Sequence, residues 1–252
     1  MLQNKAVLHF YMHFALRAAA IAAGIYAAIS LLTVGLFGVV SSSGQVETHM
    51  NGHEIAVVIF AFIFAWSSFR DEMHFFIQHG ISRKTSFFGF VIHWVIVSLV
   101  LSFIGVALPL LLVALSELFS ANINVESMFG GIYAGFSESR MALYGIHVLW
   151  LWALTMFSGF SAYFLSVLLY RMEKVGKFIL GGAFASLFII LPAINRVTND
   201  AVLRFFAMIG RLFIGDVANP NPVNGIVFFA VLAVAFTVGA FLLIRRVKLQ
   251  KS

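Results

Sequence analysis

The stretch FRDEMHFFIQHGISRK, residues 69–84, is a charged segment between two apolar runs. The run before it, 55–68, and the run after it, 85–115, contain no Asp, Glu, Lys or Arg. Basic residues at the edges of such a segment are typical of a cytoplasmic loop that joins two membrane spans. The segment therefore predicts a chain that crosses a membrane and turns back on the cytoplasmic side.

The same segment carries the start and stop signals of a short helix. Ser68 is suited to cap a helix whose third residue is Asp71, and an acidic first turn suits the helix dipole. Gly80 can end the helix in the left-handed conformation, and Ser82 can begin the next one. We therefore predict a helix over residues 69–79 that lies against the inner face of the membrane.

This short helix has more apolar surface than a solvated loop needs, which predicts a contact with a protein partner. The alternative interpretation is an interfacial helix that only anchors the loop. Large apolar side chains would fill a pocket on the partner, charged side chains would form the rim, and a glycine would set the turn. The candidate partner-binding residues are Met73, Phe75, Phe76 and Ile77, with Arg70, Asp71 and Glu72 at the rim and Gly80 at the turn.

Composition places the whole chain in the membrane. It is 62% hydrophobic and 10% charged, with a mean hydropathy of +1.00, whereas soluble domains have about 25% charged residues. We therefore predict one all-α, polytopic membrane domain over residues 1–252. The absence of cysteine excludes disulfides, thiolate metal sites and thiol catalysis. No basic groove with stacking aromatics is evident, so nucleic acid is not an expected partner.

Six apolar segments are long enough, or nearly long enough, to cross a bilayer of roughly 30 Å. The second is short and is expected to begin near Met50 or to continue into the charged segment. Pro109 predicts a kink near the far end of the third. The predicted spans are approximately 18–40, 51–68, 85–115, 141–170, 178–195 and 224–244.

Two amphipathic helices are predicted outside the spans. In residues 3–17 the basic side chains Lys5, His9, His13 and Arg17 recur every fourth position, which is typical of a helix lying in the membrane surface. A frayed polar tail is the alternative. In residues 198–213 apolar side chains follow a helical period, which predicts an external helix between spans five and six. We expect this helix to pack its apolar face on the spans and to cover an exit path; its candidate gate residues are Arg204, Phe205, Phe206 and Arg211.

The distribution of basic residues orients the chain. With both termini in the cytoplasm, twelve of the 16 Lys and Arg are inside, and four are outside. This bias follows the positive-inside rule. The outside residues are Arg140, Arg196, Arg204 and Arg211, and the polar segments 41–54 and 117–140 are expected to be external loops.

The energy source for transport is not visible in the sequence. No Asp, Glu, Lys or Arg lies in the apolar interior of a predicted span, whereas ion-coupled transporters usually need one. His93 and His147 are interpreted first as packing residues, with a proton-relay role as the alternative. A phosphate-binding loop is also absent, because Val175-Gly176-Lys177 lacks the upstream glycine and the following hydroxyl. ATP hydrolysis would then need a separate polypeptide.

Two weak catalytic patterns have simpler explanations. His49, His53 and Glu54 have helical metal-ligand spacing, but they lie in a Gly/Asn/Ser-rich segment, so surface histidines are the default. Gly159-Phe160-Ser161 lacks a second glycine and a base, and small residues in a span are normally packing contacts. We predict no catalytic, metal or cofactor-binding residue in this chain.

The layout resembles that of ABC-2-type transporter permeases. The shared features are an N-terminal surface helix, six spans, a structured helix between spans two and three, and an external amphipathic segment between spans five and six. Residues 69–88, FRDEMHFFIQHGISRKTSFF, also resemble the G-x-S-R-K-x-x-F loop frequent in small bacterial permeases of this kind. The resemblance covers the whole chain in topology, whereas its sequence motif is short.

This resemblance implies a half-transporter in the bacterial cytoplasmic membrane. Two such subunits, identical or homologous, would join two cytosolic ATP-binding subunits that hold ATP and Mg, and the 69–79 helix would be the coupling helix. No enlarged cytoplasmic opening segment is evident, which favours export of a small amphipathic cargo such as an antimicrobial peptide or a drug. A membrane-embedded enzyme acting on lipid or peptide, or a passive channel or scaffold subunit, are the alternatives.

Overall fold

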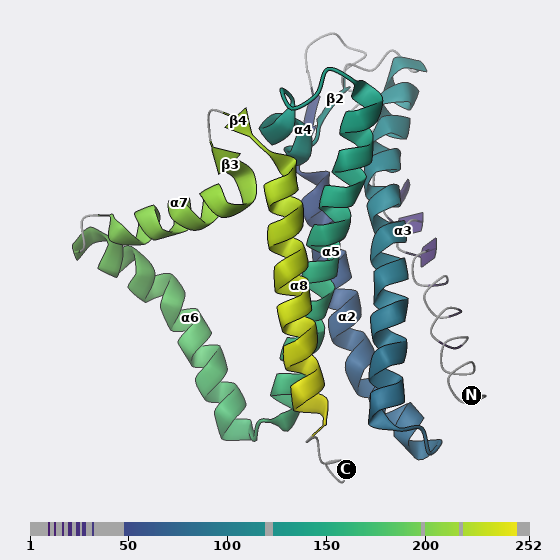
Figure 1. Cartoon of the computed structure of the whole chain (residues 1–252), viewed down its shortest axis with the longest axis vertical. Coiled ribbons are helices and arrows are strands. Elements are labelled where there is room, and N and C mark those ends of the chain that lie inside the picture. The colour runs from purple at the N-terminus through teal and green to yellow at the C-terminus, as the bar shows by residue number, and fades with distance from the viewer. Residues whose placement is uncertain are drawn as a thin grey trace.

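The computed structural model describes residues 48–118, 123–197, 200–216 and 219–245, together with scattered positions between residues 10 and 32. The predicted N-terminal surface helix and first span lie almost wholly outside the described residues. Four helices form a bundle in Figure 1, and their bounds are α2 (His53–Gln78), α3 (Arg83–Leu118), α5 (Arg140–Arg171) and α8 (Pro222–Ile244). Helix α5 contacts the other three, so it is the central element of the bundle.

Two further helices form an arm beside the bundle. Helix α6 (Lys174–Val197) leads away from the lower end of the bundle at an angle, and α7 (Ala201–Ile214) returns to the bundle near the start of α8, as Figure 1 shows. A two-residue antiparallel pair, β3 (Gly215–Asp216) and β4 (Asn219–Pro220), joins α7 to α8. Asn221 caps α8 through its side chain, which accepts a hydrogen bond from the N–H of Val223 (3.0 Å).

A small strand pair closes one end of the bundle. Strand β1 (Thr48–Asn51) pairs in parallel with β2 (Ile123–Glu126), and the six-residue helix α4 (Met128–Tyr133) follows directly. The side chain of Ser127 caps α4 by accepting a hydrogen bond from the N–H of Gly130 (2.7 Å). We call this end of the bundle the strand end. The segments predicted as external loops, 41–54 and 117–140, therefore contain ordered elements among their described residues.

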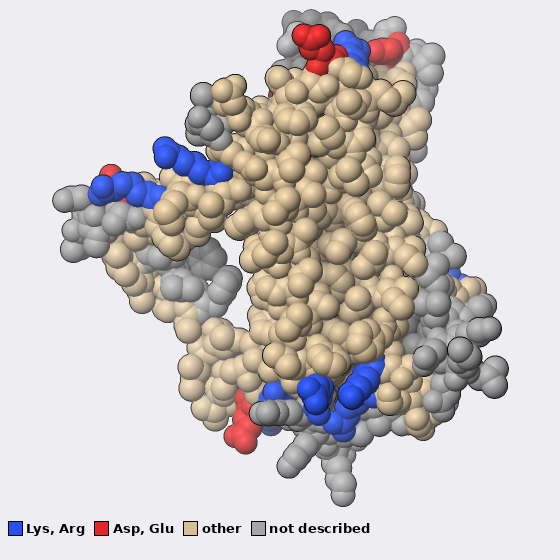
Figure 2. Space-filling model, in the orientation of Figure 1, with Lys and Arg blue, Asp and Glu red and all other residues tan. Residues whose placement is uncertain are grey.

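The opposite end carries most of the described basic side chains, and Figure 2 shows them gathered there. We call it the basic end. Its residues come from the start of α3, the end of α5, the start of α6 and the end of α8: Arg83, Lys84, Arg171, Lys174, Lys177 and Arg245.

Three helices of the described chain are long and apolar enough to cross a membrane: α3 over Arg83–Leu111, α5 and α8. The apolar part of α2, His53–Phe69, is shorter. The fold is therefore almost entirely helical and that of a membrane protein. Helix α3 continues past Pro109 without interruption, and Pro109 lies inside it.

Close packing in the bundle depends on small residues and hydroxyls. Ser158 of α5 donates a hydrogen bond to the carbonyl of Val58 in α2 (2.9 Å). The hydroxyls of Ser102 in α3 and Thr155 in α5 lie 3.2 Å apart. Each hydroxyl bond that crosses between helices satisfies a polar group that lipid could not. The small residues around Gly159 thus have the packing role that the sequence predicts, and the hydroxyl of Ser161 donates a hydrogen bond to the carbonyl of Ser158 in the same helix.

Candidate functional site

The turn at the basic end joins α2 to α3 as the sequence predicts. Gly80 has a φ of +73°, and the N–H of Ile81 donates to the carbonyl of Phe76 (2.9 Å). Ser82 then caps α3 by accepting a hydrogen bond from the N–H of Thr85 (3.1 Å). A left-handed residue followed by a bond back over five residues is how a glycine ends a helix. The predicted stop and start signals at this turn are confirmed.

A separate helix over residues 69–79 is not present, and this prediction was wrong. Helix α2 runs without a break from His53 to Gln78. Ser68 does not cap a new helix, because its hydroxyl donates to the carbonyl of Phe64 one turn earlier (3.0 Å). No proline or glycine interrupts the chain between these residues, so propagation of the existing helix is favoured over a new nucleus. The predicted second span and the predicted coupling segment therefore belong to one continuous helix.

The two phenylalanines of this segment differ in burial. Phe75 is 40% exposed, whereas Phe76 is 1% exposed. Phe10 from the N-terminal segment lies against both, with ring centroids 5.1 Å from Phe75 and 5.3 Å from Phe76. Phe76 is thus already covered within the chain, so the expectation that it faces outward is not met. The side chains of the other candidates in α2 lie outside the described residues: Arg70, Asp71, Glu72, Met73 and Ile77.

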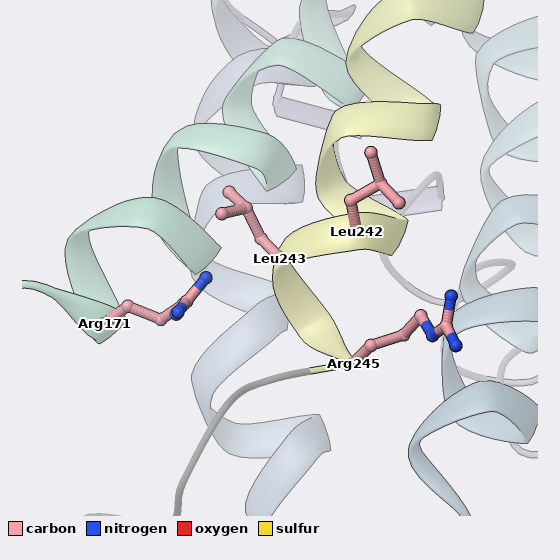
Figure 3. A pocket seen from close by; sticks show the side chains of 4 residues that line it. All are labelled: Arg171, Leu242, Leu243 and Arg245. Atoms are coloured by element: carbon pink, nitrogen blue, oxygen red, sulfur yellow. The ribbon is translucent and has the colours of Figure 1, made fainter.

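A cavity of about 500 Å³ also opens at the basic end. Figure 3 shows its lining residues, which are Arg171 at the end of α5 and Leu242, Leu243 and Arg245 at the end of α8. The guanidinium of Arg245 also lies 5.8 Å from the ring centroid of Phe241. These residues include no acid, histidine or nucleophile. Paired basic and apolar groups of this kind suit the boundary between lipid tails and water.

The predicted gate helix exists as α7, but its apolar face is mostly uncovered. Phe205, Phe206 and Leu212 are each more than half exposed, and Arg204 and Arg211 are exposed as well. The C-terminal end of α7 packs on the bundle, where the ring of Phe213 lies 5.8 Å from that of Phe229 in α8. The prediction that the apolar face packs against the spans was therefore wrong for most of α7. Helix α7 approaches the bundle with its C-terminal end, near the start of α8, and the rest of the helix extends away from the bundle (Figure 1).

A buried cluster at the strand end was not predicted from the sequence. Glu54, in the first turn of α2, is fully buried. Its Oε1 lies 3.3 Å from Nε2 of His147 in α5, and its Oε2 lies 3.5 Å from Nδ1 of His53. The N–H of Phe129 in α4 donates to the same Oε1 (3.3 Å). One carboxylate therefore connects three elements of the fold.

The histidine on α5 has a defined orientation in this cluster. The ring of His147 stacks on that of Phe129, with centroids 4.6 Å apart and planes 6° apart, and the residue is 5% exposed. His147 is therefore more than a packing residue. His93, by comparison, is fully buried with its ring near those of Phe64 and Phe90, as expected for a packing residue.

The position of Glu54 differs from the one that the sequence predicts. The sequence predicts that Glu54 belongs to a polar external loop and that no Asp, Glu, Lys or Arg lies in the apolar interior of a span. The structure places it within the bundle, although at the end of α2 and not at mid-depth. A carboxylate in such a place is costly unless its charge is balanced, and it is a candidate functional group for that reason. Among the described residues, no group of three or more His, Asp or Glu side chains could hold a metal ion.

Helix α4 connects the buried cluster around Glu54 to the end of α7. Phe129 and Tyr133 lie one turn apart on α4, with ring centroids 5.0 Å apart. The hydroxyl of Tyr133 donates to the carbonyl of Phe213 at the end of α7 (3.1 Å). Burial raises the pKa of this hydroxyl, so it remains a hydrogen-bond donor at physiological pH. Helix α4 therefore contacts Glu54 with one end and α7 with the other.

No family model matches this chain, and neither a curated protein nor a solved structure matches it significantly. The class of protein follows from the fold, which is that of a helical membrane protein with a buried carboxylate–imidazole cluster at one end.

Proposed function

We propose that this protein is the membrane subunit of an ATP-driven exporter of the ABC-2 type. On this proposal six spans cross the bacterial cytoplasmic membrane, and the basic end faces the cytoplasm with both termini. Two copies, or one copy and a homologous subunit, associate with two cytosolic ATP-binding subunits. The cargo is a small amphipathic molecule such as an antimicrobial peptide or a drug.

One observation carries the proposal. The apolar part of helix α2 ends at Phe69, but the helix continues to Gln78. The chain then turns back at Gly80, which has a positive φ. The extension lies at the basic end, where positively charged residues gather as expected for a cytoplasmic face. A continuous helix is stiff, so a force applied to the extension would be transmitted along α2 into the bundle. This is the mechanical property that a coupling element needs.

The extension also has an apolar contact point. The ring of Phe75 stays 40% exposed although Phe10 stacks on one of its faces. An exposed aromatic ring on a rigid support is a suitable anchor for a pocket on a partner, and such anchors often carry about 2 kcal/mol or more of binding energy. We therefore assign the partner contact to Phe75 first, and to Phe76 only as its packing support.

The test is association with a cytosolic ATPase. The tagged chain, expressed in its native host at its natural level, should co-purify with an ATP-binding protein. ATP hydrolysis by the complex should respond to the membrane subunit. Phe75→Ala should lower the yield of the complex several-fold, whereas Phe88→Ala, a similarly exposed ring on α3, should not. Purification of the chain alone, with turnover of a lipid or peptide bond, would support the enzyme alternative instead.

A proton-driven transporter is a second candidate, and the buried Glu54 favours it. Burying a carboxylate beside two imidazoles is the kind of arrangement in which a proton can be carried. Reconstituted vesicles distinguish the two candidates. Cargo movement that needs a pH gradient and no nucleotide favours the proton-driven transporter, and movement that needs ATP and a partner favours the exporter.

A further inference from the structure

The cavity at the basic end lies where two packed helices end together. Arg171 is the last residue of α5, and Leu242, Leu243 and Arg245 are at the end of α8. Figure 3 shows the side chain of Arg171 pointing toward α8, and Leu243 pointing toward α5. Arg245 lies on the other side of the end of α8. The cavity therefore combines two guanidinium groups with an apolar wall.

The two guanidinium groups carry charge that the described part of the chain does not balance. Arg171 and Arg245 are exposed, and neither forms an ion pair with a described residue. The exposed Glu173 is close in sequence but does not line the cavity. A helix C-terminus is equivalent to roughly −0.5 of an elementary charge, so the two helix ends balance only about half of the charge of two guanidiniums. The cavity therefore suits an anion.

The apolar wall continues along α8, away from the basic end. Leu242, Val238 and Val234 follow one another at intervals of four residues, so they lie on one face of this helix. They are 56%, 52% and 61% exposed. Helix α8 is long and apolar enough to cross a membrane, so this stripe would face lipid tails. A charged site at the end of such a stripe suits a ligand with an anionic group and a long apolar part.

The size of the cavity favours a headgroup over a free inorganic anion. Its volume of about 500 Å³ lies within the range of roughly 300–1,000 Å³ that is common for small-molecule sites. An inorganic phosphate is only a few times larger than a water molecule, which takes about 30 Å³ in the liquid. It would therefore fill only a small part of the space between the two arginines and the leucines.

We propose that this cavity binds the headgroup of an anionic phospholipid. Arg171 and Arg245 would hold the phosphodiester by charge-assisted hydrogen bonds, and an acyl chain would lie along α8 over Leu242 and Val238. Basic pockets between membrane helices are suited to anionic headgroups. A zwitterionic lipid fits less well, because it brings a cation close to the same two arginines.

A lipid bound there would connect the ends of α5 and α8. It would do so beside the start of the arm, because only Met172 and Glu173 separate the end of α5 from the start of α6. The site needs this chain and a membrane, and neither an ATPase nor a cargo. It therefore goes beyond the proposed function and is tested without any partner protein.

Four probes test the proposal on the purified, delipidated full chain in a non-ionic detergent. They are phosphatidylglycerol, phosphatidylcholine, glycerophosphoglycerol (the same anionic headgroup without acyl chains) and inorganic phosphate. Binding is measured by native mass spectrometry and by the thermal aggregation midpoint. Phosphatidylglycerol should be retained and should raise the midpoint with a saturable dose dependence, and the other three should not.

Each other pattern of binding overturns the proposal. Equal effects of phosphatidylglycerol and phosphatidylcholine would show that lipid binds without regard to its charge. Stabilisation by inorganic phosphate or by glycerophosphoglycerol at the same concentration would show a site for a soluble anion. No saturable effect of phosphatidylglycerol would show that the cavity holds no headgroup.

A double variant then assigns the site to the two arginines. Arg171→Gln with Arg245→Gln should weaken phosphatidylglycerol binding by about tenfold or more, because hydrogen bonds to charged groups are the strong ones. The matched control is Lys174→Gln with Lys177→Gln, which removes the same charge from exposed side chains at the same end that do not line the cavity. Equal losses in the two double variants would show a diffuse surface attraction and no site.

Two further variants keep the assignment testable where the glutamine pair fails to fold. Arg171→Lys with Arg245→Lys keeps the charge but loses the planar fork that matches a phosphate, so its affinity should fall between those of the wild type and the glutamine pair. Affinity equal to that of the wild type would disprove the role of the guanidiniums. Leu242→Ser should weaken phosphatidylglycerol binding several-fold, whereas Val223→Ser, at the other end of α8, should not. Equal affinity of these two variants would remove the acyl chain from α8.

Discussion

The indole ring of Trp94 in α3 lies directly over Gly159 in α5. A Cβ atom built at Gly159 would come within 1.9 Å of Cε2 of Trp94, so a larger residue at this position has no space. Trp94 is fully buried, and its ring stacks with those of Phe64 and Phe90. The close approach of α3 and α5 therefore depends on the missing side chain of one glycine.

Gly159→Ala should destabilise the bundle, because the indole must move and its stacked neighbours must move with it. Overpacking of this kind typically costs about 1–3 kcal/mol. The measurement is the thermal aggregation midpoint of the purified protein in detergent. Gly145→Ala in the same helix is the control, since nothing lies within 4 Å of the added Cβ there. Equal midpoints for the two variants would contradict the packing argument.

Ser158→Ala should remove a hydrogen bond between two helices. Its hydroxyl donates to the carbonyl of Val58 across the contact between α5 and α2. Such bonds in membrane helices contribute about 0.6 kcal/mol on average. The expected loss in denaturant or thermal stability is therefore small but greater than that of Ser67→Ala, whose hydroxyl is bonded within its own helix. The idea fails if Ser67→Ala is the more damaging of the two.

Gly80 should tolerate asparagine better than valine. Its φ is +73°, and no atom lies within 4 Å of an added Cβ, so the cost of substitution is conformational and not steric. Left-handed backbone costs roughly 1–2 kcal/mol for ordinary residues, and least for asparagine. Gly80→Val should therefore lower stability and misdirect the extension of α2, while Gly80→Asn stays near the wild type.

The same pair tests the coupling role. If the proposed function is right, Gly80→Val should leave membrane insertion intact and lower partner-stimulated ATP hydrolysis and transport together. Gly80→Asn should keep both activities near those of the wild type. Phe76→Ala is a less specific probe, because this residue is buried and its loss also removes packing inside the chain. Full coupled activity in Gly80→Val would show that the turn only anchors the helix.

Helix α7 should lie in the membrane surface. Its exposed apolar side chains need a cover, and lipid can provide one, whereas Arg204 and Arg211 would face water or headgroups. Spin labels at Phe206 and at Arg204 should therefore differ in depth, with the label at Phe206 more accessible to oxygen and less to a water-soluble relaxer. Equal aqueous accessibility at both positions would show that α7 is an ordinary exposed segment.

Much of the fold could be predicted from the sequence because its causes are local. The helical bounds of α5 and α8, the left-handed turn at Gly80 and the cap at Ser82 each follow from residues within a few positions of one another. Apolar length sets a membrane span and backbone preference sets a turn, so neither needs knowledge of distant contacts. The amphipathic period of residues 198–213 likewise predicted α7, although not what covers it.

What the tertiary structure decided is which distant residues meet. Ser68 has the chemistry of a cap, yet the helix simply continued through it, because local signals compete with an existing helix. Phe76 and Phe75 are neighbours in sequence, and only the position of Phe10 and the bundle makes one buried and the other exposed. Glu54 and His147 belong to segments on either side of α3, so no pattern within either segment could pair them. Composition and local periodicity by themselves determined a helical membrane protein, whereas the burial of Glu54 between His53 and His147 required the packing of α2, α4 and α5 together.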